Sequence, residues 1–273
     1  MATDQSAPER TPAEQHGYIQ IADDLRLQIQ NGELAAGDEL PSLSELVQKY
    51  GAGQQTARRA ISVLQAQGLI TSSQGKRPVV RGSRTRVTRS NRQHHLEKER
   101  IRLPEEERRV QGPLEDTTGI SLHDATLNVT YREVVADEST PEFETGTPLL
   151  RREYETTGKR GNRIAWSVSW IPLAFISSNP DLLDSSNEPW PGSTQHQFST
   201  VGIEIAEVVD TITARAPDTV EAARWGMSPG EPLLVGRDLM RDTQDRVVCV
   251  SLSQYPADST QMEFVTPLPK ADQ

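Results

Sequence analysis

Three short helical patterns followed by two short strand patterns occupy the first third of the chain, and this order constrains the fold more than any other feature. In the first pattern Ile21, Leu25 and Ile29 recur every four residues, which places them on one face of a helix. The pattern begins near Tyr18 and stops at Gly32, a residue type that commonly ends helices. We therefore expect a helix here with one apolar face turned to the core.

A capping box predicts the start of the second helix. Ser42 stands three residues before Glu45, so the serine hydroxyl can accept a hydrogen bond from the backbone N–H of Glu45. In return, the Glu45 carboxylate can accept one from the backbone amide of Ser42. The helix that follows should turn Leu46 and Val47 toward the core and end at Gly51.

A third helical pattern runs over residues 54–67 and stops at Gly68. Its apolar residues recur at helical spacing, at Ala57, Ala60, Ile61 and Leu64. Two short strand patterns follow, at residues 69–72 and 78–81. Three helices followed by a two-stranded hairpin is the order of elements in a winged helix-turn-helix, which we expect at residues 16–82.

The formal charge of −10 at pH 7 conceals an asymmetry that bears on nucleic-acid binding. An acidic total by itself argues against such binding, because phosphate contacts need basic surface. Residues 58–109, however, hold 14 basic and 5 acidic side chains, whereas residues 111–273 hold 12 basic and 25 acidic ones. The split predicts a nucleic-acid-binding segment joined to an acidic domain that DNA would repel.

Residues 83–113 are dense in arginine and glutamate and poor in apolar residues. This composition is typical of a solvated linker, and it also fits a partly ordered helix that leans on DNA or on a partner subunit. We assign residues 83–113 as a charged linker and leave both structures open. Residues 1–15 and 267–273 are expected to be tails.

Alternation of apolar and polar residues predicts a strand-rich second domain at residues 114–266. In the stretch 163–172, one face carries Ile164, Trp166, Val168 and Trp170, and the other carries Ala165, Ser167, Ser169 and Ile171. Further strands are predicted at residues 208–215, 233–240 and 246–255. Asp218 and Glu221 form a second capping box, so helices are interspersed and the fold class is α+β.

A set of short stretches between residues 32 and 80 forms a recognisable pattern. It consists of Gly32-Glu33-Leu34-Ala35-Ala36-Gly37-Asp38-Glu39-Leu40-Pro41-Ser42, Glu45-Leu46, Tyr50-Gly51, Thr56-Ala57-Arg58-Arg59-Ala60-Ile61, Leu64, Gly68-Leu69-Ile70 and Gln74-Gly75. The pattern resembles the DNA-binding domain of the GntR family of bacterial transcription regulators. The resemblance implies a winged helix-turn-helix that binds double-stranded DNA.

Two departures from the family pattern affect base reading. Ser44 stands where family members commonly carry an arginine, and Gly53-Gln54-Gln55 stands where they often read serine-arginine-threonine. Because glutamine pairs best with adenine and arginine with guanine, the operator should depend less on guanine than is usual. The candidate DNA-contacting residues are Ser42, Ser44, Gln54, Gln55, Thr56, Arg58, Arg59, Gln74, Lys76 and Arg77.

A looser pattern covers the second domain. Its stretches are Gly146-Thr147-Pro148-Leu149-Leu150, Ser169-Trp170-Ile171-Pro172, Ala222-Ala223-Arg224-Trp225-Gly226-Met227, Gly230-Glu231-Pro232-Leu233-Leu234 and a last strand that reaches Tyr255 and Asp258. The pattern resembles the UTRA effector-binding domain of the HutC-type subfamily. The resemblance implies an α+β fold of the chorismate-lyase type that binds a small metabolite and dimerises.

The ligand is expected to differ from a sugar phosphate. Arginines that hold phosphate in such family members align here with Tyr154 and Thr156, although Arg151 and Arg152 stand earlier in the strand and a register shifted by two residues would restore an arginine. Without that clamp, a neutral or mostly apolar ligand fits better. The candidate effector-binding residues are Tyr154, Thr156, Ser167, Ser169, Trp170 and Tyr255.

Other function classes have little support in the sequence. Residues 111–273 contain no phosphate-binding loop, nucleophile elbow or paired metal ligands, so we expect neither an enzyme nor a cofactor. His94-His95 has no third ligand nearby and Cys249 is the only cysteine, so no metal site is expected. The absence of a long apolar run or a signal-peptide pattern favours a cytoplasmic protein with no membrane partner.

Together these observations predict a homodimeric DNA-binding repressor whose affinity for a palindromic operator responds to a small-molecule effector. One alternative is a second domain that only dimerises or binds protein. A second alternative is a lyase-like enzyme, because the fold implied by the resemblance is shared with a lyase.

Overall fold

The computed structural model describes residues 12–71, 76–82, 87–110, 125–158, 163–227 and 231–268, with the backbone alone for 12–16, 109 and 110. The chain forms two compact units. The first comprises Met1–Arg84 with Met227–Glu231, and the second comprises Thr85–Gly226 with Pro232–Gln273. None of the helices in the described ranges is both long and apolar enough to cross a membrane.

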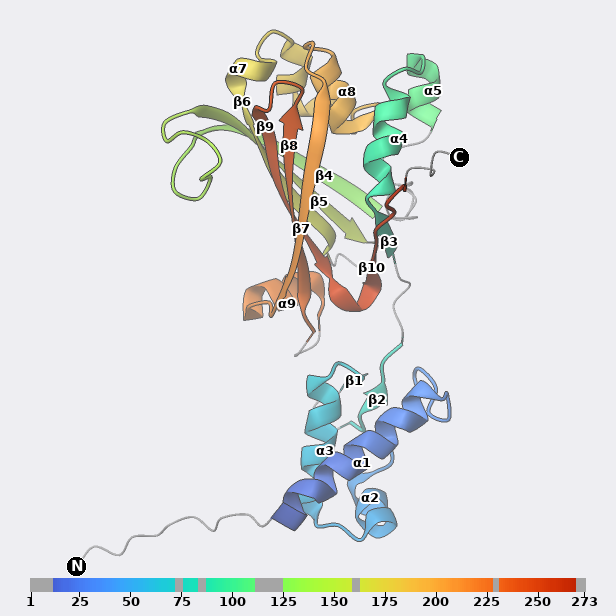
Figure 1. The fold of residues 1–273 in the computed structure, drawn as a ribbon. Coiled ribbons are helices and arrows are strands. Elements are labelled where there is room, and N and C mark those ends of the chain that lie inside the picture. Colours follow the sequence, from blue (N-terminus) through green and yellow to red (C-terminus); the bar gives the residue numbers. More distant parts are fainter. Residues whose placement is uncertain are drawn as a thin grey trace, which may run out of the picture. The chain divides into compact units, whose positions relative to one another are not determined.

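The first unit has the predicted winged helix-turn-helix order. It contains α1 (Pro12–Gln30), α2 (Leu43–Tyr50), α3 (Gln54–Ala66), β1 (Ile70–Thr71) and β2 (Val79–Val80), and the two strands pair antiparallel (Figure 1). The first helix begins at Pro12 rather than near Tyr18, so the end of the expected N-terminal tail is helical. Proline suits the first position of a helix, because its fixed φ is helical and its missing N–H would have no partner there.

One apolar core holds the three helices of the first unit together. Leu25 of α1, Leu46 of α2 and Leu64 of α3 are all fully buried in it. The predicted capping box is formed, since Ser42 Oγ accepts from the Glu45 amide at 3.2 Å and Glu45 Oε2 accepts from the Ser42 amide at 2.6 Å. Helix α2 therefore begins where the sequence indicates, and the core fixes how α3 is presented.

The second unit is built on a six-stranded antiparallel sheet in the order β4-β5-β6-β9-β8-β7 (Figure 1). The strands are β4 (Ala125–Val135), β5 (Pro148–Gly158), β6 (Arg163–Pro172), β7 (Ile205–Arg215), β8 (Leu233–Asp242) and β9 (Val247–Pro256). The sheet and its helices make the unit α+β, as the alternation and the capping box predicted.

Short helices lie at the two ends of this sheet. Figure 1 shows α7 (Leu173–Ile176) and α8 (Ser193–Ser199) at one end and α9 (Thr219–Trp225) at the other. The described residues of the unit also form 3-10 turns at Pro180–Leu183, Ser185–Asn187 and Ala257–Ser259. The second predicted capping box is also formed, between Asp218 and Glu221 at the start of α9.

The described part of the expected linker is ordered and belongs to the second unit. It forms β3 (Val87–Ser90), α4 (Arg92–Arg100) and α5 (Glu105–Val110), and β3 pairs in parallel with β10 (Thr260–Glu263). Helix α4 packs against α8. None of the residues of α4 is fully buried, which explains why a composition poor in apolar residues indicated a solvated linker. We call residues 87–100 the connecting segment.

Truncating a buried leucine in α1 should lower the stability of the first unit without affecting that of the second. Leu25→Ala is expected to lower the stability of the first unit by about 2–5 kcal/mol, because it leaves a cavity in the core. All four tryptophans, Trp166, Trp170, Trp190 and Trp225, lie in the second unit. Urea unfolding should therefore show an earlier loss of helical circular dichroism and an unchanged tryptophan-fluorescence midpoint.

The matched control is Leu27→Ala, on the same helix, where the leucine is 52% exposed. It should change stability by less than about 0.5 kcal/mol. Equal shifts of both probes in Leu25→Ala would contradict independent folding of the two units.

Candidate functional site

The outward face of α3 carries most of the candidate base-reading residues. Gln54, Gln55, Arg58 and Arg59 are exposed, while Ala57 and Ala60 of the same helix are fully buried. The N-cap residue of α3 is Gly53, which supplies no side-chain cap to the first turn. The first-turn amides and the exposed side chains thus lie at the end of the helix that a winged helix-turn-helix presents to DNA.

The two arginines on this face differ in their contacts. The Arg59 guanidinium lies 4.2 Å from the centroid of the Tyr18 ring on α1, a cation–π contact that holds it against the unit. Among the described residues, Arg58 has no ion pair or ring contact. Thr56 is partly buried, and a Cβ at Gly17 would lie 3.5 Å from its methyl group. Of these three residues, Arg58 is the one that is exposed and makes no ring contact within the described ranges.

Candidates at the hairpin and at α2 are arranged around the capping box. Arg77 lies 3.8 Å from Glu39 and 3.9 Å from Glu45, in pairs that are half exposed and therefore weak. The Ser44 hydroxyl is 3.5 Å from that of Ser42, which serves as the cap. Lys76 is exposed, and Gln74 lies outside the described residues.

The second unit contains a cavity of about 270 Å³ on one face of its sheet. Five cross-strand partners form a line across β7, β8, β9, β6 and β5, and all five line the cavity: Asp210, Asp238, Ser251, Ser169 and Arg152. We call this line the polar row. It begins with two acids, continues with two serines and ends with an arginine.

Small side chains beside the polar row leave the space that forms the cavity. The next line of cross-strand partners includes Gly236, Ser253 and Ser167, followed by Tyr154. A Cβ built on Gly236 would lie 3.7 Å from Ile212 Cδ1, so alanine would fit there. Larger side chains at these positions would fill the cavity.

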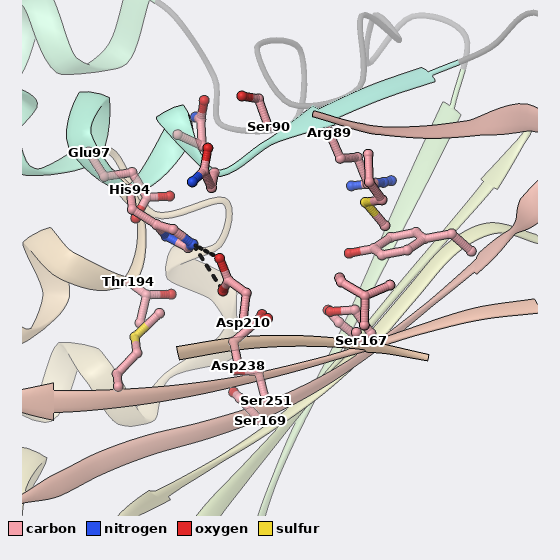
Figure 2. A pocket seen from close by; sticks show the side chains of 18 of the residues that line it. Arg89, Ser90, His94, Glu97, Ser167, Ser169, Thr194, Asp210, Asp238 and Ser251 are labelled. Carbon is pink, nitrogen blue, oxygen red and sulfur yellow. Dashed lines mark hydrogen bonds and ion pairs between the residues drawn. The ribbon is translucent and has the colours of Figure 1, made fainter. Parts of the chain in front are cut away.

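The connecting segment forms a wall of the cavity. Its contributions are Arg89, Ser90, Asn91, Gln93, His94 and Glu97, and further residues come from α8 and β10. Figure 2 shows His94, Glu97 and Asp210 on one side of the cavity and Arg89 on the other. The walls and floor therefore carry charges of both signs.

A histidine and three carboxylates make up the acidic side. His94 Nε2 lies 3.1 and 3.2 Å from the two carboxylate oxygens of Asp210. Burial and the neighbouring charge of Asp210 raise the pKa of Asp238 to about 7, and burial also raises the pKa of Glu97. Burial alone would lower the pKa of His94, but the hydrogen bond and charge of Asp210 outweigh it and raise that pKa.

Two arginines make up the basic side. The Arg89 guanidinium lies 3.7 Å from the centroid of the Tyr255 ring, and its Nε is buried without an acceptor in the described part of the chain. Burial lowers the pKa of Arg89. Arg152 is 2% exposed and donates to Ser169 Oγ at 3.2 Å and to Gln197 Oε1.

A second cavity of about 270 Å³ shares six lining residues with the first: Arg89, Glu97, Tyr154, Ser167, Thr194 and Tyr255. Its wall includes Glu188, whose Oε1 accepts hydrogen bonds from three side chains: Tyr131 at 2.5 Å, Tyr154 at 2.9 Å and Gln197 at 3.0 Å. Burial raises the pKa of Tyr131 to about 12, so the phenol stays protonated and continues to donate. The network holds Tyr154 in place between the two cavities.

Five of the six residues expected to bind an effector line these cavities. Tyr154, Ser167 and Tyr255 line both, Ser169 lines the first and Thr156 the second. Trp170, the sixth, is not among the lining residues. With the exception of Trp170, the residues expected to bind an effector therefore lie in one region of the second unit.

The expectation of a neutral or mostly apolar ligand does not fit this lining. Arg152 takes the inward position two residues before Tyr154, so an arginine is present in the strand after all. Sequence reasoning also missed Arg89 and His94, which it assigned to a linker. For Asp210 a signal existed, since it lies between Val208 and Ile212 on the same face of a predicted strand.

Comparisons with known proteins bear on both units. The model of bacterial regulatory proteins of the gntR family matches residues 18–80, and the UTRA domain model matches residues 165–261. An uncharacterized HTH-type transcriptional regulator of Rhizobium meliloti is 25% identical over 250 residues, which is 91% of this chain and 94% of that protein. The mannosyl-D-glycerate transport/metabolism system repressor MngR of Escherichia coli is 42% identical over 67 residues, 24% of this chain and 28% of that protein.

A solved structure supports the fold of the chain. The crystal structure of a GntR-family transcriptional regulator matches 94% of this chain and 99% of its own, with a TM-score of 0.68 and 22% identity. The fold class, a winged helix-turn-helix followed by an α+β domain that matches the UTRA model, is thus confirmed.

The raised pKa values predict that the second unit loses stability as the pH rises. Asp238 holds its proton up to about pH 7 in the folded chain but only to about pH 4 when unfolded, so its contribution to stability falls as pH rises between these values. The raised pKa of His94 acts in the same direction at higher pH. Asp238→Asn should therefore lose less thermal stability than the wild type between pH 5 and 8.

The measurement is the melting temperature followed by tryptophan fluorescence at several pH values. Asp245→Asn serves as the control, because the Asp245 side chain is 88% exposed in the β8–β9 turn. This control should keep the wild-type pH dependence. An identical pH dependence in Asp238→Asn would mean that Asp238 is ionised throughout.

Proposed function

Because this chain belongs to the GntR family of bacterial regulatory proteins and carries a UTRA domain, we propose that it is a repressor whose operator affinity responds to a small metabolite. The first unit binds the operator with α3 in the major groove. The second unit binds the metabolite in its cavity. The chain acts in the cytoplasm as a regulator of transcription, not as an enzyme.

The observation that carries this proposal is the position of the connecting segment. It follows the first unit directly in the chain, and its side chains Arg89, His94 and Glu97 line the cavity. A ligand in the cavity therefore contacts the segment that leads to the DNA-binding unit. A coupling of about 1–3 kcal/mol between the two sites would change operator affinity about 5- to 150-fold.

A homodimer on a palindromic operator is the second part of the proposal. Two winged helices of one dimer occupy half-sites about 34–36 Å apart, so that the symmetry of the operator mirrors that of the protein. The similarity of the first unit to the repressor MngR supports repression as the sign of regulation. Gln54 and Gln55 at the start of α3 favour adenine in the half-site.

A second unit that only dimerises or binds protein is the alternative. Charged side chains inside a cavity argue against it, because a buried charge without a partner costs stability that a purely structural domain has no reason to lose. The Arg89 guanidinium lies on the Tyr255 ring, but its buried Nε has no hydrogen-bond acceptor among the described residues. A metabolite that pairs with such a charge would offset this cost in stability.

Arg58→Ala should weaken specific operator binding about 5- to 150-fold, because a base-contacting side chain contributes about 1–3 kcal/mol. Gel-shift titration at fixed salt against the region upstream of the gene, with an unrelated duplex in parallel, measures this loss. Arg26→Ala is the control, since Arg26 is paired with Asp23 on the surface of α1. It should keep wild-type affinity.

Two results would contradict the DNA-binding part of the proposal. If Arg58→Ala binds the operator as tightly as wild type, Arg58 does not read a base. If wild type itself forms no specific, salt-sensitive complex with the upstream region, the chain does not regulate its own gene or the adjacent genes by binding an operator there.

Sedimentation equilibrium should report twice the 30.3 kDa mass of one chain at the concentrations used for DNA titration. The expectation follows from symmetric reading of two half-sites by two winged helices. A single-chain mass, both free and on DNA, would rule out the dimer.

A further inference from the structure

The charges that line the first cavity are separated by sign. The carboxylates of Glu97, Asp210 and Asp238 come from α4, β7 and β8, whereas the guanidinium groups of Arg89 and Arg152 come from β3 and β5. Figure 2 shows Arg89 across the cavity from the His94–Asp210 pair. The proposed function, on which the inference rests, names only a small metabolite. The separation of charges indicates which chemical class of metabolite the cavity binds.

The acidic side has a deficit of positive charge. His94 pairs with Asp210, and Lys98 of the same helix is directed to Glu204 and the carbonyl oxygen of Ile205. Asp238 is the direct cross-strand partner of Asp210, an arrangement in which like charges repel. In the described ranges no cation lies within 4.0 Å of the Asp238 carboxylate. An incoming cation would relieve this repulsion and favour the ionised form of Asp238, which otherwise holds its proton up to about pH 7.

The basic side has the opposite deficit. Arg89 rests on the Tyr255 ring, its Nε is buried without an acceptor, and no described carboxylate lies within 4.0 Å of it. Among the described residues, the groups to which Arg152 donates are neutral, and the carboxylate of Glu188 reaches it through Gln197. A guanidinium in such surroundings favours an anion that can accept two hydrogen bonds at once.

The floor between the two sides is neutral and can form hydrogen bonds. Ser251 and Ser169 stand between Asp238 and Arg152 in the polar row. Three strand spacings of about 4.8 Å separate the backbones of Asp238 and Arg152, a span of about 14 Å that the side chains shorten. The cavity of about 270 Å³ suits a small metabolite rather than a polymer.

We infer that the cavity selects a dipolar metabolite, with an ammonium-type cation at Asp238 and a carboxylate or phosphate at Arg89. The cation donates to Asp238 and Asp210, the anion accepts from Arg89, and the serines of the polar row contact the middle of the molecule. Since Arg89 belongs to the connecting segment and Asp238 to the sheet, one such ligand joins the two.

Binding of matched compounds to the full-length chain tests the inference. The probes are ω-amino carboxylates and ω-aminoalkyl phosphates with about two to seven methylene groups, a range chosen to fit within the span of the polar row. Their monopolar matches are alkylamines, alkyl carboxylates and alkyl phosphates of the same length. By titration calorimetry at neutral pH, at least one dipolar compound should bind about tenfold or more tightly than either of its monopolar matches.

Two variants assign the two ends of the ligand. Asp238→Asn should abolish the advantage of the dipolar compound over its anionic match, and Arg89→Gln should abolish its advantage over the amine. The controls are Asp245→Asn and Arg132→Gln, whose side chains are exposed and outside the cavity. Both controls should bind as wild type does, and tryptophan-fluorescence melting verifies that every variant is folded.

The inference is wrong if an anionic or cationic match binds as tightly as its dipolar compound, or if no dipolar compound of the series binds. It is also wrong if Asp238→Asn still binds the dipolar compound more tightly than the anionic match that lacks the amine. Operator titration separates this failure from failure of the proposed function. A monopolar compound that changes operator affinity would leave the proposed function standing, whereas wild-type protein that binds no operator would remove it.

Discussion

The contact between His94 and Asp210 is the interaction on which the cavity depends, because it helps hold the connecting segment against the sheet. Helix α4 has no fully buried residue, so apolar burial contributes little to its position. Lys98 donates to the carbonyl oxygen of Ile205, and Gln195 donates to that of His94. Because each such bond contributes about 1 kcal/mol net, and charged ones about 1.5–3 kcal/mol, α4 is held by an energy that ligand binding can match, while β3 of the same segment is also held by its pairing with β10.

The two units use their side chains in different ways. The first unit completes an apolar core, with Leu25, Leu46 and Leu64 fully buried, and leaves the polar face of α3 outside. In the second unit the antiparallel sheet aligns one residue from each strand, so that acids, serines and an arginine meet in the polar row. A ligand-controlled repressor needs two parts: a rigid DNA-binding unit and a ligand cavity whose polar walls can adjust.

Local rules predicted the parts of the structure that depend on neighbours in sequence. The capping boxes at Ser42 and Asp218 join residues three apart, and both are formed. Alternation placed Ser167 and Ser169 on one face of a strand, and both line the cavity. The omission of Arg152 came from aligning the strand with family members, since alternation alone puts Arg152 on the same face as Tyr154.

By itself the sequence determined the order of elements in the first unit, the starts of α2 and α9 and the two faces of the strand at residues 163–172, because periodicity and capping act within a few residues. Only the tertiary structure decided which strands are neighbours and that Arg89 and His94 line a cavity. The pairing of β3 with β10 joins Val87 to Thr260, and the polar row joins five strands in an order that differs from the chain. No local pattern specifies such partners, since they are chosen by the packing of the whole unit.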